Sequence, residues 1–310
     1  MKMNYTQNEN KETESPVEPI DNMKIEFFPS IFSPHKSNFL KLEDAEIYYE
    51  VLGEGPALIF IHGLGGNHLS WWQQVPYFSD RYKCINFSHR GFAHSKNYSN
   101  RIGHEVFAED LSALIEHLNL KDVYIVAQSM GGWTALTYTL SRSENVKAVV
   151  MASTSGTIDF RQVESIDLEK LSSWEEWSQK EISELKEEGV LNAIGRKMSE
   201  RDPFLSYNYE QIYNLTPYSY KEFIRADIKR ERIKSPDLLA SLQIPFLFIT
   251  GELDVSFPPI GGKAVASIMP DAQWKTFEET GHSVYFEKAN EFNKIVDEFL
   301  TSVSGIAFKD

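Results

Sequence analysis

Blocks of apolar residues separated by polar segments predict an alternation of strands and helices along most of the chain. Short apolar runs are typical of buried strands, and apolar residues that recur every three to four positions are typical of helices packed by one face. The expected strands lie at 57–61, 82–87, 123–126, 146–151, 244–250 and 274–277. The expected helices between and after them lie near 69–75, 103–118, 133–140, 262–268 and 284–299. This alternation predicts an α/β fold with a mostly parallel, doubly wound sheet.

An antiparallel hairpin is expected before the first of these strands. Two strand patterns, at 38–42 and 45–51, are separated by the tight-turn pair Glu-Asp at 43–44. The sequence GEGP at 53–56 then breaks the chain. The hairpin is therefore expected at one edge of the sheet.

The alternation stops between about 157 and 235, where no apolar strand run occurs. Helical patterns replace it, and the first has Leu171, Trp174, Trp177, Ile182 and Leu185 on one face. We interpret the segment as an inserted helical cap, whose apolar underside would form the roof of a substrate pocket. Trp174, Trp177 and Tyr213 are candidates for substrate binding, although plain packing between cap and core explains such aromatic residues equally well.

Four segments are expected in total. They are a disordered, polar and acidic tail at 1–22, a first part of the core at 23–156, the cap at 157–235 and a second part of the core at 236–310. Residues 23–36 carry several phenylalanines and two prolines and receive no structural assignment.

Composition and charge narrow the classes of function. The chain has 310 residues, of which 42% are hydrophobic and 25% charged, as in ordinary globular proteins. Its formal net charge of −14 argues against binding to nucleic acid or to an anionic membrane surface. No apolar run approaches the roughly 20 residues of a membrane span, and the N-terminus has no hydrophobic signal region, so a cytoplasmic location is expected. The sequence does not indicate an oligomeric state.

Cys84 is the single cysteine, which excludes an internal disulfide and a zinc site made of several thiolates. It lies in the strand pattern at 82–87, so an inert buried thiol is expected. We expect neither a metal nor an organic cofactor, and the expected partner is a small-molecule substrate.

A serine stands at a sharp strand-to-helix junction. The strand run at 123–126 leads into the sequence AQSMG at 127–131, and helical spacing follows. This is the nucleophile elbow, G-x-S-x-G, with Ala127 in place of the first glycine. Such a turn exposes the Ser129 hydroxyl beside the free N–H groups of a helix N-terminus. The alternative is a plain strand–helix junction with Ser129 as N-cap residue.

Ser129, Asp254 and His282 all follow predicted parallel strands, and the C-terminal ends of such strands are where sites form in open sheets. Their order along the chain is the one that accompanies the elbow. A serine hydroxyl needs a base, histidine titrates in the right range, and a buried carboxylate holds the imidazole tautomer. Glu252 also lies close in sequence, but its side chain is expected to point away if Asp254 faces the site.

The backbone N–H groups of Leu64 and Met130 are the expected donors to the oxyanion. Met130 directly follows the nucleophile, and Leu64 lies in a glycine-rich turn after a predicted strand. We interpret His62, at the start of that turn, as structural support for the loop, because His282 is the better candidate for the base.

These motifs together resemble those of the α/β-hydrolase fold family over about residues 37–300. The matching segments are HGLG at 62–65 with Trp71 for the oxyanion loop, SHRGFAHS at 88–95 for the D-x-R-G-x-G-x-S loop, GELD at 251–254 for the acid turn and GH at 281–282 for the histidine turn. The resemblance implies an α/β-hydrolase fold with Ser129 as nucleophile, Asp254 as acid and His282 as base.

Three positions depart from the family pattern. Ala127 replaces a glycine of the elbow, Ser88 replaces the usual aspartate, and Ala93 replaces another glycine. The last two lie in a loop that supports the fold and borders the site. A serine nucleophile also argues against haloalkane dehalogenases and epoxide hydrolases, which use an aspartate at this position.

The sequence therefore predicts a serine hydrolase that cleaves an ester or related acyl bond of a small, mostly apolar substrate. A C–C bond hydrolase, a lyase or a cofactor-free peroxidase on the same triad is the alternative, because the loop at 65–66 and the elbow also resemble those of C–C bond hydrolases and enol-lactonases. A ligand-binding receptor on a hydrolase scaffold is a further hypothesis, since fold alone does not determine function.

Overall fold

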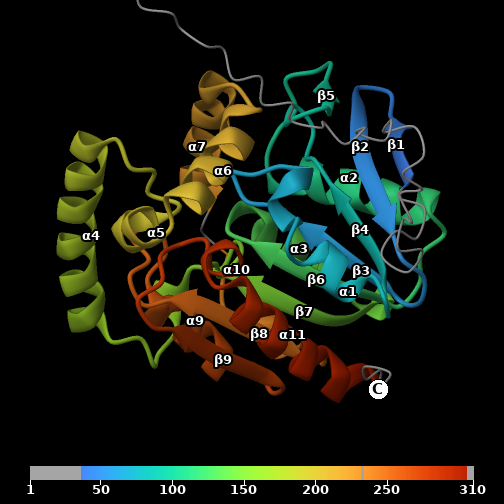
Figure 1. Ribbon diagram of the computed structural model, residues 1–310. Helices are drawn as coiled ribbons and strands as arrows, with labels where there is room; N and C mark the ends of the chain where they lie inside the picture. Colours follow the sequence, from blue (N-terminus) through green and yellow to red (C-terminus); the bar gives the residue numbers. More distant parts are fainter. Residues whose placement is uncertain (1–35, 232–233, 306–310) are drawn as a thin grey trace, which may run out of the picture. The chain divides into compact units, whose positions relative to one another are not determined.

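The computed structural model describes residues 36–231 and 234–305 (Figure 1). The tail expected at 1–22 and residues 23–35 lie outside the described residues. Among the helices of the described part, none combines the length and the apolar character needed to cross a membrane.

Nine strands of the described residues form one sheet. They are β1 (Lys36–Lys41), β2 (Ala45–Leu52), β3 (Ala57–Ile61), β4 (Lys83–Phe87), β5 (Lys96–Asn97), β6 (Val123–Gln128), β7 (Val146–Ala152), β8 (Phe246–Gly251) and β9 (Ala272–Phe277). The order is β1-β2-β4-β3-β6-β7-β8-β9, with β5 paired to β2. β1 and β2 form an antiparallel edge hairpin, and all pairings from β4 to β9 are parallel. The predicted hairpin and the mostly parallel sheet are confirmed.

Helices follow most of the parallel strands. They are α1 (Val75–Phe78), α2 (His104–His117), α3 (Met130–Ser141), α4 (Leu168–Glu188), α5 (Gly195–Arg201), α6 (Pro203–Asn214), α7 (Tyr218–Glu231), α8 (Asp237–Ala240), α9 (Pro259–Ser267), α10 (Val284–Glu287) and α11 (Ala289–Ser304), with short 3-10 helices at His68–Trp71, Ser143–Asn145 and Phe160–Gln162.

The sheet is buried on both faces, because successive residues of one strand enter two different apolar clusters. In β3, Ile59 and Ile61 belong to one cluster, and Leu58 and Phe60 belong to the other. All five residues of β3 are buried, as are all six of β6 and all six of β8. This burial explains why these strands appear in the sequence as unbroken apolar runs.

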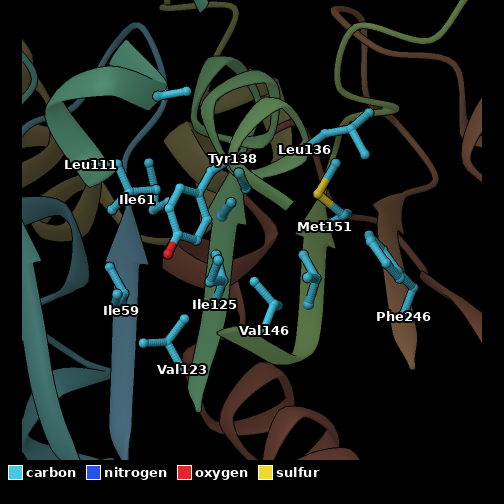
Figure 2. Close-up of a cluster of buried hydrophobic side chains, with 14 of the residues drawn as sticks. Ile59, Ile61, Leu111, Val123, Ile125, Leu136, Tyr138, Val146, Met151 and Phe246 are labelled. Carbon is cyan, nitrogen blue, oxygen red and sulfur yellow. The ribbon is translucent and has the colours of Figure 1, made fainter. Parts of the chain in front are cut away.

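Helices cover each of the two clusters. Figure 2 shows the first, where Leu111 of α2 lies near the strand residue Ile61 and Leu136 of α3 lies near the strand residue Met151. The second takes Phe78 from α1 and Phe292 from α11. The helices expected on both faces are therefore confirmed.

Helices α4–α7 lie between β7 and β8 in the chain, and we call them the helical insertion (168–231). Figure 1 shows them as one group, coloured yellow-green to orange. The longest, α4, begins at its N-cap Asp167 and ends at Gly189, which has a φ of 74° that favours glycine. Its buried residues are Leu171, Ser178 and Leu185, so most of its surface faces solvent.

Several elements differ from the sequence-based expectation. The helix expected near 69–75 is a 3-10 helix at His68–Trp71 followed, after a break, by α1 (Val75–Phe78). The patterns do not reveal α6, although Asp202 accepts a hydrogen bond from the Leu205 N–H and Pro203 occupies the first turn, as at many helix starts. β5 has two residues, too few for a periodic signal. The single closing helix expected near 284–299 is two helices, because Lys288 has a non-helical φ of −125° and ψ of 54°.

Candidate active site

Ser129 lies in a strained turn between β6 and α3. Its φ is 50° and its ψ is −119°, a conformation that residues with a Cβ rarely adopt. Ser129 is at the N-cap position of α3, as the alternative interpretation expects, but its side chain makes no capping hydrogen bond. Strain at a residue that does not stabilise its own helix is typical of functional sites.

Two glycines allow the close packing around this turn. A Cβ at Gly131 would lie 2.3 Å from the Ile61 carbonyl oxygen at the end of β3. A Cβ at Gly63 would lie 2.1 Å from Gln128 Oε1 and 3.1 Å from Ser129 Cβ. The turn after β3 therefore lies directly against the serine.

Asp254 and His282 contact each other beyond the ends of β8 and β9. His282 Nδ1 lies 2.8 Å from Asp254 Oδ2 and 3.0 Å from Oδ1, and Asp254 is fully buried. Asp254 Oδ1 also accepts the backbone N–H groups of Ser256 and Phe257 at 2.8 and 2.9 Å. The carboxylate thus acts as an acceptor, and this assigns the ring hydrogen of His282 to Nδ1.

Glu252, the competing acid, does not contact His282. Its carboxylate is exposed and accepts the backbone N–H of Glu279 at 3.0 Å. Asp254 is the acidic residue that meets the imidazole.

The serine lies beside the histidine turn. Gln128, the residue before Ser129, is buried and donates from Nε2 to the His282 carbonyl at 3.4 Å. Among the described residues, the His282 ring is hydrogen-bonded to Asp254 and not to Ser129. The hydrogen bond between nucleophile and base is often long in free enzymes and shortens in complexes with substrate.

The two predicted oxyanion donors lie near each other and are free. Met130 is the first residue of α3, and Leu64 lies in the turn after β3. Neither backbone N–H donates a hydrogen bond to another residue of the described ranges. Both side chains pack in one small cluster with Phe92, Phe107 and Ile224.

His62 fixes the orientation of one of these donors. Its Nδ1 donates to the Gly63 carbonyl at 2.8 Å, and its Nε2 accepts the His89 N–H at 3.0 Å. Gly63 O and the Leu64 N–H belong to the same planar peptide and point in opposite directions, so holding the carbonyl aims the N–H. Complete burial lowers the pKa of His62 to about 3, which keeps the ring neutral.

The three aromatic residues proposed for substrate binding have different surroundings. Trp174 donates from its indole nitrogen to the Asp254 carbonyl at 2.8 Å. Tyr213 is half-buried beside Gly65 in the turn after β3. Trp177 lies by a cavity of about 170 Å³, with the other lining residues Glu181, Leu185, Ile194, Gly195, Arg196, Lys197, Leu253, Val255 and Gly281. The structure does not bring the three side chains together.

Several residues without a sequence signal also reach the site. Tyr209 of α6 is buried, and its hydroxyl accepts a hydrogen bond from Ser283, next to His282, at 3.2 Å. Asn67 donates to the Ile212 carbonyl of α6 at 2.8 Å. Glu287 accepts the Gly281 N–H. These contacts join segments far apart in the chain, so periodicity does not reveal them.

A metal centre has no candidate within the described ranges, where no group of three or more His, Cys, Asp or Glu side chains converges. Cys84 is fully buried in β4, and burial raises the pKa of its thiol well above the ordinary value.

Comparison with known proteins places the chain in a family. The family model described as "alpha/beta hydrolase fold" matches residues 56–289. The non-heme chloroperoxidase CPO-A1 of Kitasatospora aureofaciens is 27% identical over 285 residues, which cover 83% of this chain and 97% of the relative.

Two solved structures are similar in fold. An esterase from Thermogutta terrifontis has a TM-score of 0.69 and 20% identity, and the match covers 86% of this chain and 99% of the esterase. An enol-lactonase from Burkholderia xenovorans LB400 has a TM-score of 0.67 and 20% identity, and the match covers 85% of this chain and 100% of the enol-lactonase. The chain belongs to the α/β-hydrolase fold family and is an enzyme of that family.

Proposed function

We propose that the protein is a serine hydrolase that cleaves an ester or related acyl bond through Ser129, His282 and Asp254. The observation that carries the proposal concerns the edge of the sheet formed by the C-terminal ends of the parallel strands. The strained Ser129 at the elbow lies at this edge, as does the hydrogen-bonded Asp254–His282 pair. A serine hydroxyl group is activated by a nearby histidine whose tautomer is fixed by a buried acid. Here the Ser129 side chain makes no capping hydrogen bond that would compete with this role.

In the proposed reaction, Ser129 Oγ attacks the carbonyl carbon of the substrate while His282 Nε2 takes its proton. Asp254 stabilises the resulting imidazolium through Nδ1–H. The imidazolium then protonates the leaving group, and an acyl-enzyme remains on Ser129. Water, activated by the same nitrogen, releases the acid and restores the serine.

The negative charge of the tetrahedral intermediate would be held by the free N–H groups of Leu64 and Met130. Donors that are already oriented need no rearrangement during the reaction, and this is where their catalytic value lies. The His62–Gly63 hydrogen bond supports this role, because it orients the Leu64 peptide before the substrate arrives.

We further propose that the helical insertion acts as a cap over the site. Three buried or half-buried contacts support this: Trp174 with Asp254, Tyr209 with Ser283, and Ile212 with Asn67. The cavity beside Trp177 is lined by apolar side chains together with the paired Glu181 and Arg196 and with Lys197, and it borders the acid and histidine turns. A small, mostly apolar substrate fits these surroundings.

A cofactor-free peroxidase activity on the same triad is the second candidate, because a relative over most of the chain is named a non-heme chloroperoxidase. A C–C bond hydrolase or lyase would use the same residues. In C–C bond cleavage the bond that breaks is a carbon–carbon bond instead of an ester bond. In the peroxidase reaction, hydrogen peroxide instead of water attacks the acyl-enzyme.

A substrate panel tests the proposal. Wild type, Ser129→Ala and Ser153→Ala would be assayed with short nitrophenyl esters, an enol-lactone, a 1,3-diketone, and an ester with hydrogen peroxide and bromide. Ser153 is a matched control, because it also has a positive φ (53°) and is buried. Ester turnover by wild type and Ser153→Ala, lost in Ser129→Ala, is expected. Turnover of only the diketone, or only peroxide-dependent bromination, would favour the second candidate.

A further inference from the structure

Glu287 is a buried carboxyl group on the turn that carries His282, and the proposed mechanism gives it no role. It ends α10 and is 9% exposed. The Gly281 N–H lies 3.0 Å from Oε1 and 3.1 Å from Oε2, so both oxygens share this donor. The backbone N–H of Ser283 also favours the charged form of Glu287. The backbone donor directly before His282 is therefore held by one side chain.

The residue before the histidine is packed between this carboxyl group and the sheet. A Cβ at Gly281 would lie 2.9 Å from Glu287 Oε1, so the absence of a side chain permits the contact. On the other side, a Cβ at Gly251, the last residue of β8, would lie 2.1 Å from the Gly281 carbonyl oxygen. The histidine turn is thus packed closely between Glu287 and the end of the strand that leads to Asp254.

The charged and titratable groups around Glu287 come from several elements. Arg201 of α5 favours its charged form and Asp254 of the acid turn opposes it, and Glu287 in turn raises the pKa of Tyr209 of α6. Burial is the largest influence and raises the pKa of Glu287 to about 8. A buried carboxyl group without a close cation costs stability, so stability alone does not explain a glutamate here.

We propose that Glu287 is a positioning residue for the base: by holding the backbone N–H of the residue before His282, it fixes the point from which the imidazole ring projects. The inference rests on the proposed serine-hydrolase function. Asp254 fixes the ring through Nδ1, and Glu287 fixes the main chain behind it. Both are needed to aim Nε2 at Ser129, because a misplacement of about 1 Å can cost about 10²-fold in rate.

The first test compares Glu287→Gln, Glu287→Ala and the control Glu291→Ala. Glutamine keeps an oxygen that can accept the Gly281 N–H, whereas alanine removes it. Glu291 lies in the next helix and its side chain is 50% exposed. For Glu287→Ala we expect kcat to fall roughly 10- to 100-fold with KM changed less than about threefold, as for a loss of orientation alone. Glu287→Gln should recover most of kcat at neutral pH, and Glu291→Ala should match wild type.

The pH profile provides a readout that a purely structural role would not change. As pH rises through about 8, wild-type Glu287 ionises, binds the backbone donors more strongly and favours the imidazolium that forms during reaction. The value of kcat/KM in wild type should therefore keep rising across this range. In Glu287→Gln this rise should be absent, because the amide does not titrate.

Labelling of Ser129 by a fluorophosphonate separates this inference from the proposed function. If wild type is not labelled, the proposed function fails. If wild type is labelled, and folded Glu287→Ala is labelled at the wild-type rate, the positioning role is wrong. If Glu287→Ala does not fold, Glu287→Gln decides: a pH profile identical to that of wild type would overturn the inference.

Discussion

The central sheet and the helical insertion are held together in different ways. Strands β3, β6 and β8 are buried at every position, and their residues pack into continuous apolar clusters on both faces. The insertion has a 21-residue helix, α4, with buried residues only at Leu171, Ser178 and Leu185. Large apolar side chains of the insertion, such as Phe204 and Tyr207, face solvent.

The insertion contributes fewer buried apolar residues, such as Leu171, Met198 and Ile212, to the clusters of the sheet, and it also meets the candidate active site through individual polar contacts. Trp174 reaches the acid turn, Tyr209 reaches the residue after His282, and Ile212 accepts from Asn67 after β3. The comparison indicates a division of roles. The sheet holds the strands that Ser129, Asp254 and His282 follow, and under the proposed function the insertion would shape the surroundings of the substrate.

The largest expected effect comes from the acid on the sheet. Asp254→Asn should lower kcat for an ester substrate by about 10⁴-fold, because the amide no longer holds the imidazole in the required tautomer. Steady-state kinetics on the purified variant measures this. Glu252→Gln is the matched control, since Glu252 is exposed and bonds to the Glu279 backbone. A comparable loss in both variants would contradict the assignment of the acid.

The next prediction compares how much the sheet and the helical insertion contribute to the free energy of unfolding. Phe60→Ala, at a fully buried position of β3, should lower the free energy of unfolding by about 3–5 kcal/mol. Phe204→Ala, at a position of α6 that is 87% exposed, should change it by less than about 0.5 kcal/mol. Urea unfolding followed by circular dichroism gives both values. Similar losses in the two variants would show that the insertion is part of the stability core.

A smaller effect is expected where the insertion contacts the acid turn. Trp174→Phe keeps an aromatic ring but removes the N–H that donates to the Asp254 carbonyl. Loss of one such bond, worth about 1 kcal/mol, should lower kcat/KM about fivefold through displacement of the turn. Trp177→Phe, compared in the same assay, has no such bond to lose. If the Trp174 variant and wild type have equal kinetics, the hydrogen bond from the insertion to the acid turn does not affect catalysis.

The smallest effect concerns the substrate. Trp177→Ala should raise KM a few-fold for esters with larger apolar groups and leave acetate esters unchanged, because Trp177 borders the cavity and contributes little elsewhere. A series of esters of increasing size tests this. An equal change for all esters would mean that the cavity does not hold the substrate.

The sequence predicts those parts of the fold that depend on local pattern. The buried strands and the edge hairpin follow from short-range periodicity and turn residues, and they are found near the expected positions. Ser129, Asp254 and His282 are also found by this logic, because each lies one to five residues after the end of a strand in one parallel part of the sheet. The contact between Asp254 and His282 needs only that their strands be neighbours, as β8 and β9 are.

Other features depend on contacts between distant segments. The hydrogen bond from Ser283 to Tyr209 spans 74 positions, and that from Asn67 to Ile212 spans 145. No repeat or turn signal encodes such pairings. Glu287 lies at a helical position with an ordinary acidic residue type, and the contact of its carboxyl group with the histidine turn depends on the absence of a side chain at Gly281.

The most direct test of the account is the reaction of the full chain with a fluorophosphonate, followed by intact mass and peptide mapping. The account predicts one adduct per chain, located on Ser129, its loss in Ser129→Ala, and its retention in Ser153→Ala. A well-folded wild type that takes no adduct, or takes it on another residue, would contradict the proposed nucleophile.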